Sequence, residues 1–188
     1  MLTRDQALKL LYGNMQSINL RRHCLAVEAV MRVLARHFGS NEEKWAVVGL
    51  LHDGDYEKTK NNPAQHTILM HQWLKEMGED DQEILAAILS HNYGHTGQNP
   101  PKNNLEWSLY CCDELTGLIV AVALVRPDKK LRSVTLESIM KKWNIKAFAA
   151  GVNREQVKTC ETELHIPLPE FIGIALKAMQ GISNDLGL

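Results

Sequence analysis

The sequence VVGLLHDG at residues 47–54 joins an apolar run directly to a histidine, an aspartate and a glycine. The run is typical of a buried helix that begins near Asn41, and Gly54 is expected to end it. His52 and Asp53 therefore lie side by side at the end of a core helix. An imidazole and a carboxylate at adjacent positions can bind one metal ion, and the carboxylate can bridge two ions. Alone, a His-Asp pair indicates little.

Helical patterns fill the sequence on both sides of this stretch, and no clean alternating strand pattern appears. Thr3 and Gln6 form a capping-box pattern at the first helix, and Arg126-Pro127 stops the longest one. We expect helices over about 3–13, 19–38, 41–53, 63–77, 79–92 and 105–125, followed by shorter ones that begin near Thr135, Asn153 and Pro167. The sequence thus predicts an all-α fold of about eight or nine helices.

Further metal-ligand types lie within the apolar stripes of these helices. His23 falls between Leu20 and Val27, His91 follows the apolar face of its helix, and Asp113 lies within a strongly apolar helix. A buried carboxylate is costly unless it is paired, hydrogen-bonded or bound to metal. A single inward histidine is most often a core residue, but the ordered set predicts a metal site. Its ligands suit a divalent transition metal such as Mn, Fe, Zn, Ni or Co, with Mg as a further option.

The order His23, then His52-Asp53 after its apolar run, then Asp113 resembles the HD superfamily of metal-dependent phosphohydrolases over about residues 18–126. The segments at residues 113–118, 126–130 and 148–154 look like those of small stand-alone HD-domain proteins that are known as predicted hydrolases. The resemblance implies an HD-domain helical bundle. We therefore expect one domain over residues 1–188, with a metal-binding core at about 18–126 and a helical extension at 127–188.

The resemblance also implies roles for individual residues. The four core ligands would be His23, His52, Asp53 and Asp113. In a binuclear site His66 and His91 would complete a second metal, with Asp53 as the bridge; this is the arrangement we favour. The alternative is a single metal held by the four core ligands, with both remaining histidines contacting the substrate.

Two departures from known branches limit what the resemblance says about the substrate. The branch that cleaves cyclic dinucleotides has a Gly-Tyr-Pro motif and a doubled histidine with glutamate, whereas this chain has HNYGH at residues 91–95. Three residues after Asp53, where that branch has lysine and a mononuclear nucleotidase group has a catalytic glutamate, this chain has Tyr56. Neither mechanism therefore transfers directly.

The expected reaction is hydrolysis of a phosphate ester, in a nucleotide or another small phosphorylated metabolite, by attack of a metal-activated hydroxide. Asp53 would position the hydroxide. Asp55 is a candidate general base, and Glu57 is better explained as a turn residue. His95 is a candidate general acid, with a surface loop residue as the competing interpretation.

Several cations are candidate phosphate contacts, and each also has a simpler explanation. Arg22 is adjacent to His23, but a residue beside an inward one often faces solvent. Arg126, Lys129 and Lys130 follow the helix of Asp113, where cations favour the helix C-terminus. Arg126 lies about 20 Å from Asp113 along that helix, which argues against direct contact unless the chain folds back.

Composition excludes some classes of protein. Lys plus Arg number 21 and Asp plus Glu 22, so bulk charge gives no reason to expect binding to nucleic acid or an anionic membrane. The apolar runs are short for a bilayer span, and the start of the chain has no secretory signal pattern. The four cysteines lack CxxC spacing. We therefore expect a reduced, cytoplasmic protein.

Two other functions compete with hydrolysis. A non-catalytic HD-fold module could sense a nucleotide or bind a partner, although such a module has no need of every ligand. A di-iron oxygenase is a third option, because some binuclear HD-fold proteins use mixed-valent iron.

Overall fold

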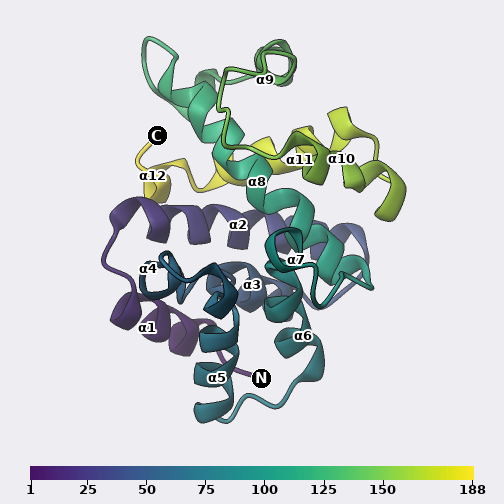
Figure 1. Cartoon of the computed structure of the whole chain (residues 1–188). Helices are drawn as coiled ribbons and strands as arrows, with labels where there is room; N and C mark the ends of the chain where they lie inside the picture. Colours follow the sequence, from purple (N-terminus) through teal and green to yellow (C-terminus); the bar gives the residue numbers. More distant parts are fainter.

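The computed structural model describes all residues 1–188 and is entirely helical, so the predicted all-α fold is confirmed (Figure 1). Three helices lie at its centre: α2 (Ile18–His37), α3 (Glu42–Leu51) and α8 (Asn104–Leu124). The others are α1 (Arg4–Asn14), α4 (Tyr56–Thr59), α5 (Ile68–Glu76), α6 (Gln82–His91), α7 (Tyr93–Thr96), α9 (Leu136–Trp143), α10 (Arg154–Glu163), α11 (Leu168–Gly181) and α12 (Ser183–Leu186), with short 3-10 turns η1 (Pro63–Gln65) and η2 (Leu131–Ser133).

The helices α2 and α3 approach each other closely because of Gly49, a glycine within the apolar run before His52. A Cβ atom at Gly49 would lie 2.9 Å from Cγ of Met31 and 3.0 Å from the backbone of Glu28. No larger residue fits there without a shift of the α2 backbone. The glycine of the apolar run therefore brings the His-Asp pair against α2, which carries His23.

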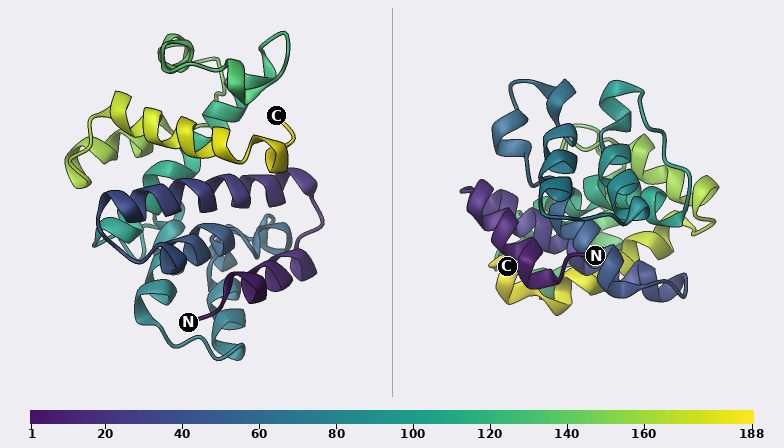
Figure 2. Two further views of the ribbon diagram at one scale, coloured as in Figure 1. Left: turned by 180° about the vertical axis from the view of Figure 1, so that it is seen from behind. Right: turned by 90° about the horizontal axis from the view of Figure 1, so that it is seen from below.

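The layers are arranged around α2. It packs on one side against α3 and on the other against α11, and α8 crosses it (Figures 1 and 2). α10 packs on α8, so the C-terminal part of the chain folds back onto the central helices. α6 also packs on α8 and α3, close to the end of α3.

Several predicted helix starts are confirmed in atomic detail. Thr3 and Gln6 make both hydrogen bonds of a capping box, and Thr135 makes the same arrangement with Ser138. Asn153 caps α10 by accepting the N–H of Gln156, although the Gln156 side chain does not return to the cap and instead contacts α8.

The prediction of a single helix over residues 63–77 is wrong. The chain forms η1, breaks at His66 and Thr67, and resumes as α5. Thr67 has φ of 69°, an unusual value for a β-branched residue, which ends the first turn and reorients the chain. The Asn92 side chain donates to the carbonyl oxygens of Pro63 (2.8 Å) and His66 (3.2 Å) and so holds the break in place.

The longest helix, α8, is long and apolar enough by composition to cross a membrane, which the short apolar runs did not suggest. Most of it is buried against other helices of this chain, however, and Asp113 lies near its middle. Core helices of soluble proteins commonly have this character. All four cysteines are unpaired and buried, as expected of thiols that pack in a core.

Candidate metal centre

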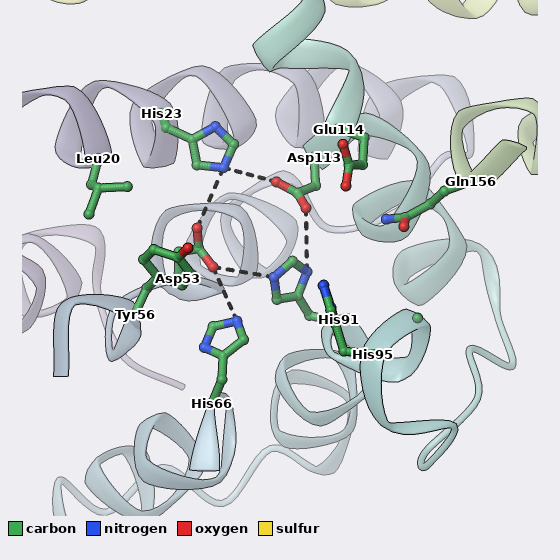
Figure 3. A pocket seen from close by; sticks show the side chains of 11 residues that line it. Leu20, His23, Asp53, Tyr56, His66, His91, His95, Asp113, Glu114 and Gln156 are labelled. Carbon is green, nitrogen blue, oxygen red and sulfur yellow. Dashed lines mark ion pairs between the residues drawn. The ribbon is translucent and has the colours of Figure 1, made fainter. Parts of the chain in front are cut away.

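All six predicted ligands meet at one place, although they come from distant segments of the chain. Figure 3 shows all of them except His52. Five line a cavity of about 360 Å³, and His52 lies behind it, fully buried. The ligands are His23 on α2, His52 and Asp53 at the end of α3, His66 between η1 and α5, His91 at the end of α6, and Asp113 on α8.

The first group of donors combines two histidines with a carboxylate. Nε2 of His23 lies 2.9 Å from Oδ1 of Asp113 and 3.2 Å from Nε2 of His52. The same Asp113 oxygen lies 3.5 Å from Nε2 of His52. Three donor atoms this close together can bind one metal ion.

Asp53 joins this group to a second one. Its Oδ2 lies 3.7 Å from Nε2 of both His23 and His52. Its Oδ1 lies 3.3 Å from Nε2 of both His66 and His91. One carboxylate therefore faces two pairs of imidazoles with its two oxygens, which is the arrangement of a bridging ligand.

The hydrogen bonds behind three of the histidines fix which ring nitrogen faces the centre. Nδ1 of His52 donates to the carbonyl oxygen of Gly49 (2.8 Å). Nδ1 of His23 donates to the hydroxyl oxygen of Thr116 (3.1 Å). The Thr116 hydroxyl in turn donates to the carbonyl oxygen of Asp113 (2.9 Å). Both rings consequently turn Nε2 inward, and without a proton this nitrogen is the one that can bind metal.

His66 is fixed in the same way by a carboxylate. Its Nδ1 donates to Oδ1 of Asp55 (2.7 Å), and the other Asp55 oxygen accepts the N–H of Met70 (3.0 Å). Asp55 is fully buried and does not line the cavity. The expectation that Asp55 acts as a general base is therefore wrong, because its carboxylate lies behind a ligand and cannot reach a substrate.

His91 supplies a further sign that the donor set suits metal. Its Nδ1 is buried and has no hydrogen-bond partner, and it lies 3.9 Å from Oδ2 of Asp113. Buried polar atoms without partners are rare in proteins and often mark a site for an ion or water. Together with the inward Nε2 atoms, this atom shows that the residues present fit one or two divalent ions.

The close approach of histidines and carboxylates shifts the pKa values of the ligands in the metal-free centre. Burial would raise the pKa values of Asp53 and Asp113, but the surrounding histidines hold both well below the usual range. Burial would lower the pKa of His23, but the hydrogen bond to Asp113 and the nearby carboxylates raise it to about 9. Hydrogen bonds to Asp53 and Asp55 likewise outweigh burial and raise the pKa of His66 to about 9. Burial lowers the pKa of His91.

The predicted phosphate contacts do not lie in this cavity. Arg22 packs against Gly187 and lines a separate, more apolar hollow on the other side of His23. Arg126, Lys129 and Lys130 lie at the far end of α8 from α7, as the helix length required (Figure 1). Arg126 donates to Ser133, and both lysines are exposed.

His95 does line the cavity, on the short helix α7, and it is exposed. Glu57 is the turn residue that we expected: its carboxylate accepts the N–H groups of Gln16 and Ser17, which lead into α2. Five residues of the cavity wall were not predicted from the sequence: Leu20, Tyr56, Gly94, Glu114 and Gln156. Glu114 and Leu20 lie near predicted ligands in the chain, but no sequence signal singles out Gln156, which reaches the cavity from α10.

The comparisons with known proteins agree with this geometry. A family model described as HD domain matches residues 20–138, which include all six ligands. No curated protein and no solved structure matches the chain. Members of the matched family are generally metal-dependent phosphohydrolases. With more than half of its length matched and its histidines and aspartates gathered around Asp53, the chain belongs to the HD domain family.

Proposed function

We propose that this protein is a two-metal phosphohydrolase that cleaves a small phosphorylated metabolite. One observation carries the proposal: the two oxygens of Asp53 face separate pairs of imidazoles, His23 with His52 and His66 with His91. Asp55 also holds His66 so that its Nε2 faces Oδ1 of Asp53, the oxygen that His91 faces as well. When bound, divalent ions lower the pKa of a coordinated water and neutralise phosphate charge, which supplies the nucleophile.

The residues of the cavity would bind the metal ions, limit the access of water to them and donate a proton to the leaving group. Asp53 and Asp113 stay ionised in the buried centre and offset the charge of bound cations. Leu20 and Tyr56 line the wall of the cavity beside the ligands and restrict the entry of water (Figure 3). His95, exposed on α7, is the group we propose as proton donor to the alcohol oxygen when the phosphorus–oxygen bond breaks.

The test combines metal analysis with an activity assay on protein purified without chelator. We expect two transition-metal equivalents per chain and hydrolysis within a panel of phosphomonoesters and phosphodiesters. His66→Ala should retain one equivalent and lose most activity, and Asp53→Asn should lose activity by at least about a hundredfold. His37→Ala is the matched control, because His37 is an exposed histidine on α2, the helix that carries His23.

The same experiment separates the competing functions. One equivalent in the unaltered protein, unaffected by His66→Ala, would replace the two-metal proposal with a four-ligand site. No metal uptake at all would contradict the hydrolase proposal and favour a binding module. Bound iron with a visible or paramagnetic signal, and no hydrolysis, would favour an oxygenase.

A further inference from the structure

Beside the ligands His91 and Asp113, the cavity has a wall that the metal centre does not use. It is formed by Glu114 on α8, Gly94 on α7 and Gln156 on α10. We call these three residues the acceptor wall; His95, the proposed proton donor, lies next to His91 (Figure 3). Because Glu114 directly follows the ligand Asp113 on α8, the wall begins immediately beside the metal centre. A molecule whose phosphate lies at the metal centre would place its leaving group against this wall.

The Glu114 side chain is half-buried and has one oxygen to spare. Its Oε2 accepts the backbone N–H of Asn153 (3.0 Å), which fixes the carboxylate between α8 and the start of α10. Its Oε1 has no hydrogen-bond partner in the protein. This oxygen can accept a hydrogen bond from a molecule in the cavity, and it would repel an anion there.

Gln156 presents a second acceptor. Its Nε2 donates to the carbonyl oxygen of Tyr110 (2.8 Å). A carbonyl oxygen only accepts hydrogen bonds, so this contact determines which end of the amide is nitrogen. The amide oxygen is thereby turned toward Gly94: a Cβ atom added to Gly94 would lie 3.5 Å from it. The absence of a side chain at Gly94 leaves this oxygen accessible.

No lysine or arginine lines the cavity. Arg154, two residues before Gln156, uses its guanidinium for the carbonyl oxygens of Trp143 (2.8 Å) and Phe148 (2.6 Å). Proteins that hold a chain of phosphates normally contact it with arginine or lysine. A second or third phosphate would meet the Glu114 carboxylate here instead, so nucleoside di- and triphosphates are poor candidates.

We propose that the acceptor wall selects a phosphate ester whose leaving group carries an ammonium group, that is, a phosphorylated amino alcohol. This inference rests on the proposed function, since it places the phosphate at the metal centre. Water adds to phosphorus, the bond from phosphorus to the alcohol oxygen breaks, and that oxygen takes a proton. The products are inorganic phosphate and the free amino alcohol, whose ammonium group contacts Glu114 and Gln156.

The experiment compares phosphoethanolamine with ethyl phosphate, which lacks only the amine, on the metal-loaded protein. We expect kcat/KM to favour phosphoethanolamine by about tenfold or more, because a hydrogen bond to a charged group contributes about 1.5–3 kcal/mol. Glu114→Gln keeps the side-chain shape and should reduce this ratio at least about fivefold. Glu155→Gln, an exposed carboxylate on α10, is the matched control and should leave the ratio unchanged.

Three results would overturn the inference while leaving phosphohydrolysis intact. They are equal rates for both esters, a preference for glycerol 3-phosphate over phosphoethanolamine, and a preference for ADP or ATP. If no ester of the wider panel is hydrolysed, the proposed function fails separately. Calorimetry then measures the binding of the same two esters to the metal-loaded protein. Tighter binding of phosphoethanolamine supports selection of the ammonium group by the acceptor wall, and equal binding contradicts it.

Discussion

Single atoms decide which way each imidazole of the metal centre faces. The carbonyl oxygen of Gly49, the hydroxyl of Thr116 and the carboxylate of Asp55 each accept a hydrogen bond from Nδ1 of one histidine and so turn its Nε2 toward the centre. These acceptors are as important to the site as the ligands themselves, because a ring with the wrong tautomer cannot bind metal.

Asp55→Ala tests this at His66, which our proposal assigns to a second metal. The substitution leaves Nδ1 of His66 and the N–H of Met70 without their acceptor. We expect the affinity for the second metal equivalent to fall about 10–100-fold, with the first equivalent little changed. Metal titration by calorimetry measures both steps. Asp55→Asn, which retains an acceptor oxygen, should fall in between. Unaltered binding of the second equivalent in Asp55→Ala would refute the positioning role.

Much of the ligand set could be predicted from single residues. His23, His91 and Asp113 lie at helical spacing within apolar stripes, and this spacing alone places them inward. His66 could be placed only through the resemblance, because it lies at a break that the helical pattern concealed. The role of Asp55 was misjudged because the side chains of Asp53, Asp55 and Glu57 point in different directions, although they lie close together in the sequence. Sequence spacing does not show which of them faces the cavity.

Helix packing brings these residues together, and α2 and α3 lie too close at Gly49 for a larger side chain. Gly49→Ala would place a methyl group 2.9 Å from Met31 and 3.0 Å from the Glu28 backbone. We expect a loss of about 1–3 kcal/mol in the free energy of unfolding and weaker metal binding, since His52 lies one turn further on.

A second glycine provides the matched control. Gly173 lies within α11, and a Cβ atom there meets nothing within 4 Å. Gly173→Ala should therefore stabilise the protein by about 0.5–1 kcal/mol through helix propensity alone. Chemical denaturation of both variants measures the two changes. A Gly49→Ala protein as stable as the unaltered chain would show that α2 and α3 can separate without cost.

Helix boundaries were predictable where capping residues mark them, as at Thr3, Asn41 and Thr135. The four-residue helices α4, α7 and α12 were not, because one turn is too short to show a period. Contacts between helices that are distant in sequence could not be predicted from the sequence either. The place of Gln156 in the cavity, for example, depends on α10 folding back onto α8.

The metal centre links the stability of the entire fold to pH. In the metal-free protein the pKa values of His23 and His66 are raised to about 9 by their carboxylate partners. A histidine with a raised pKa contributes stability that is complete below its unfolded value of about 6.5 and is lost as pH rises through about 9. Metal binding displaces the same protons, so metal affinity increases over this range.

We therefore expect the melting temperature of chelator-treated protein to fall between about pH 6.5 and 9.5, and that of metal-loaded protein to change less. The gap between them should widen with pH and reach about 5 °C or more once free metal exceeds about a hundred times its dissociation constant. Thermal melts across this range, with and without chelator, measure the gap. A gap that is constant or narrows with pH would contradict this linkage.

The region that matches the family, residues 20–138, contains every metal ligand, whereas Asn153 and Gln156 lie beyond it. The cavity wall that we propose for selectivity therefore draws on both parts: Glu114 and Gly94 lie inside the matched region, and Gln156 is added from outside it. We expect substitutions at Gln156 to change this side of the cavity while the candidate ligands stay in place. This makes α10 the segment to vary first in any redesign of the cavity, because it reaches the cavity without carrying a candidate ligand.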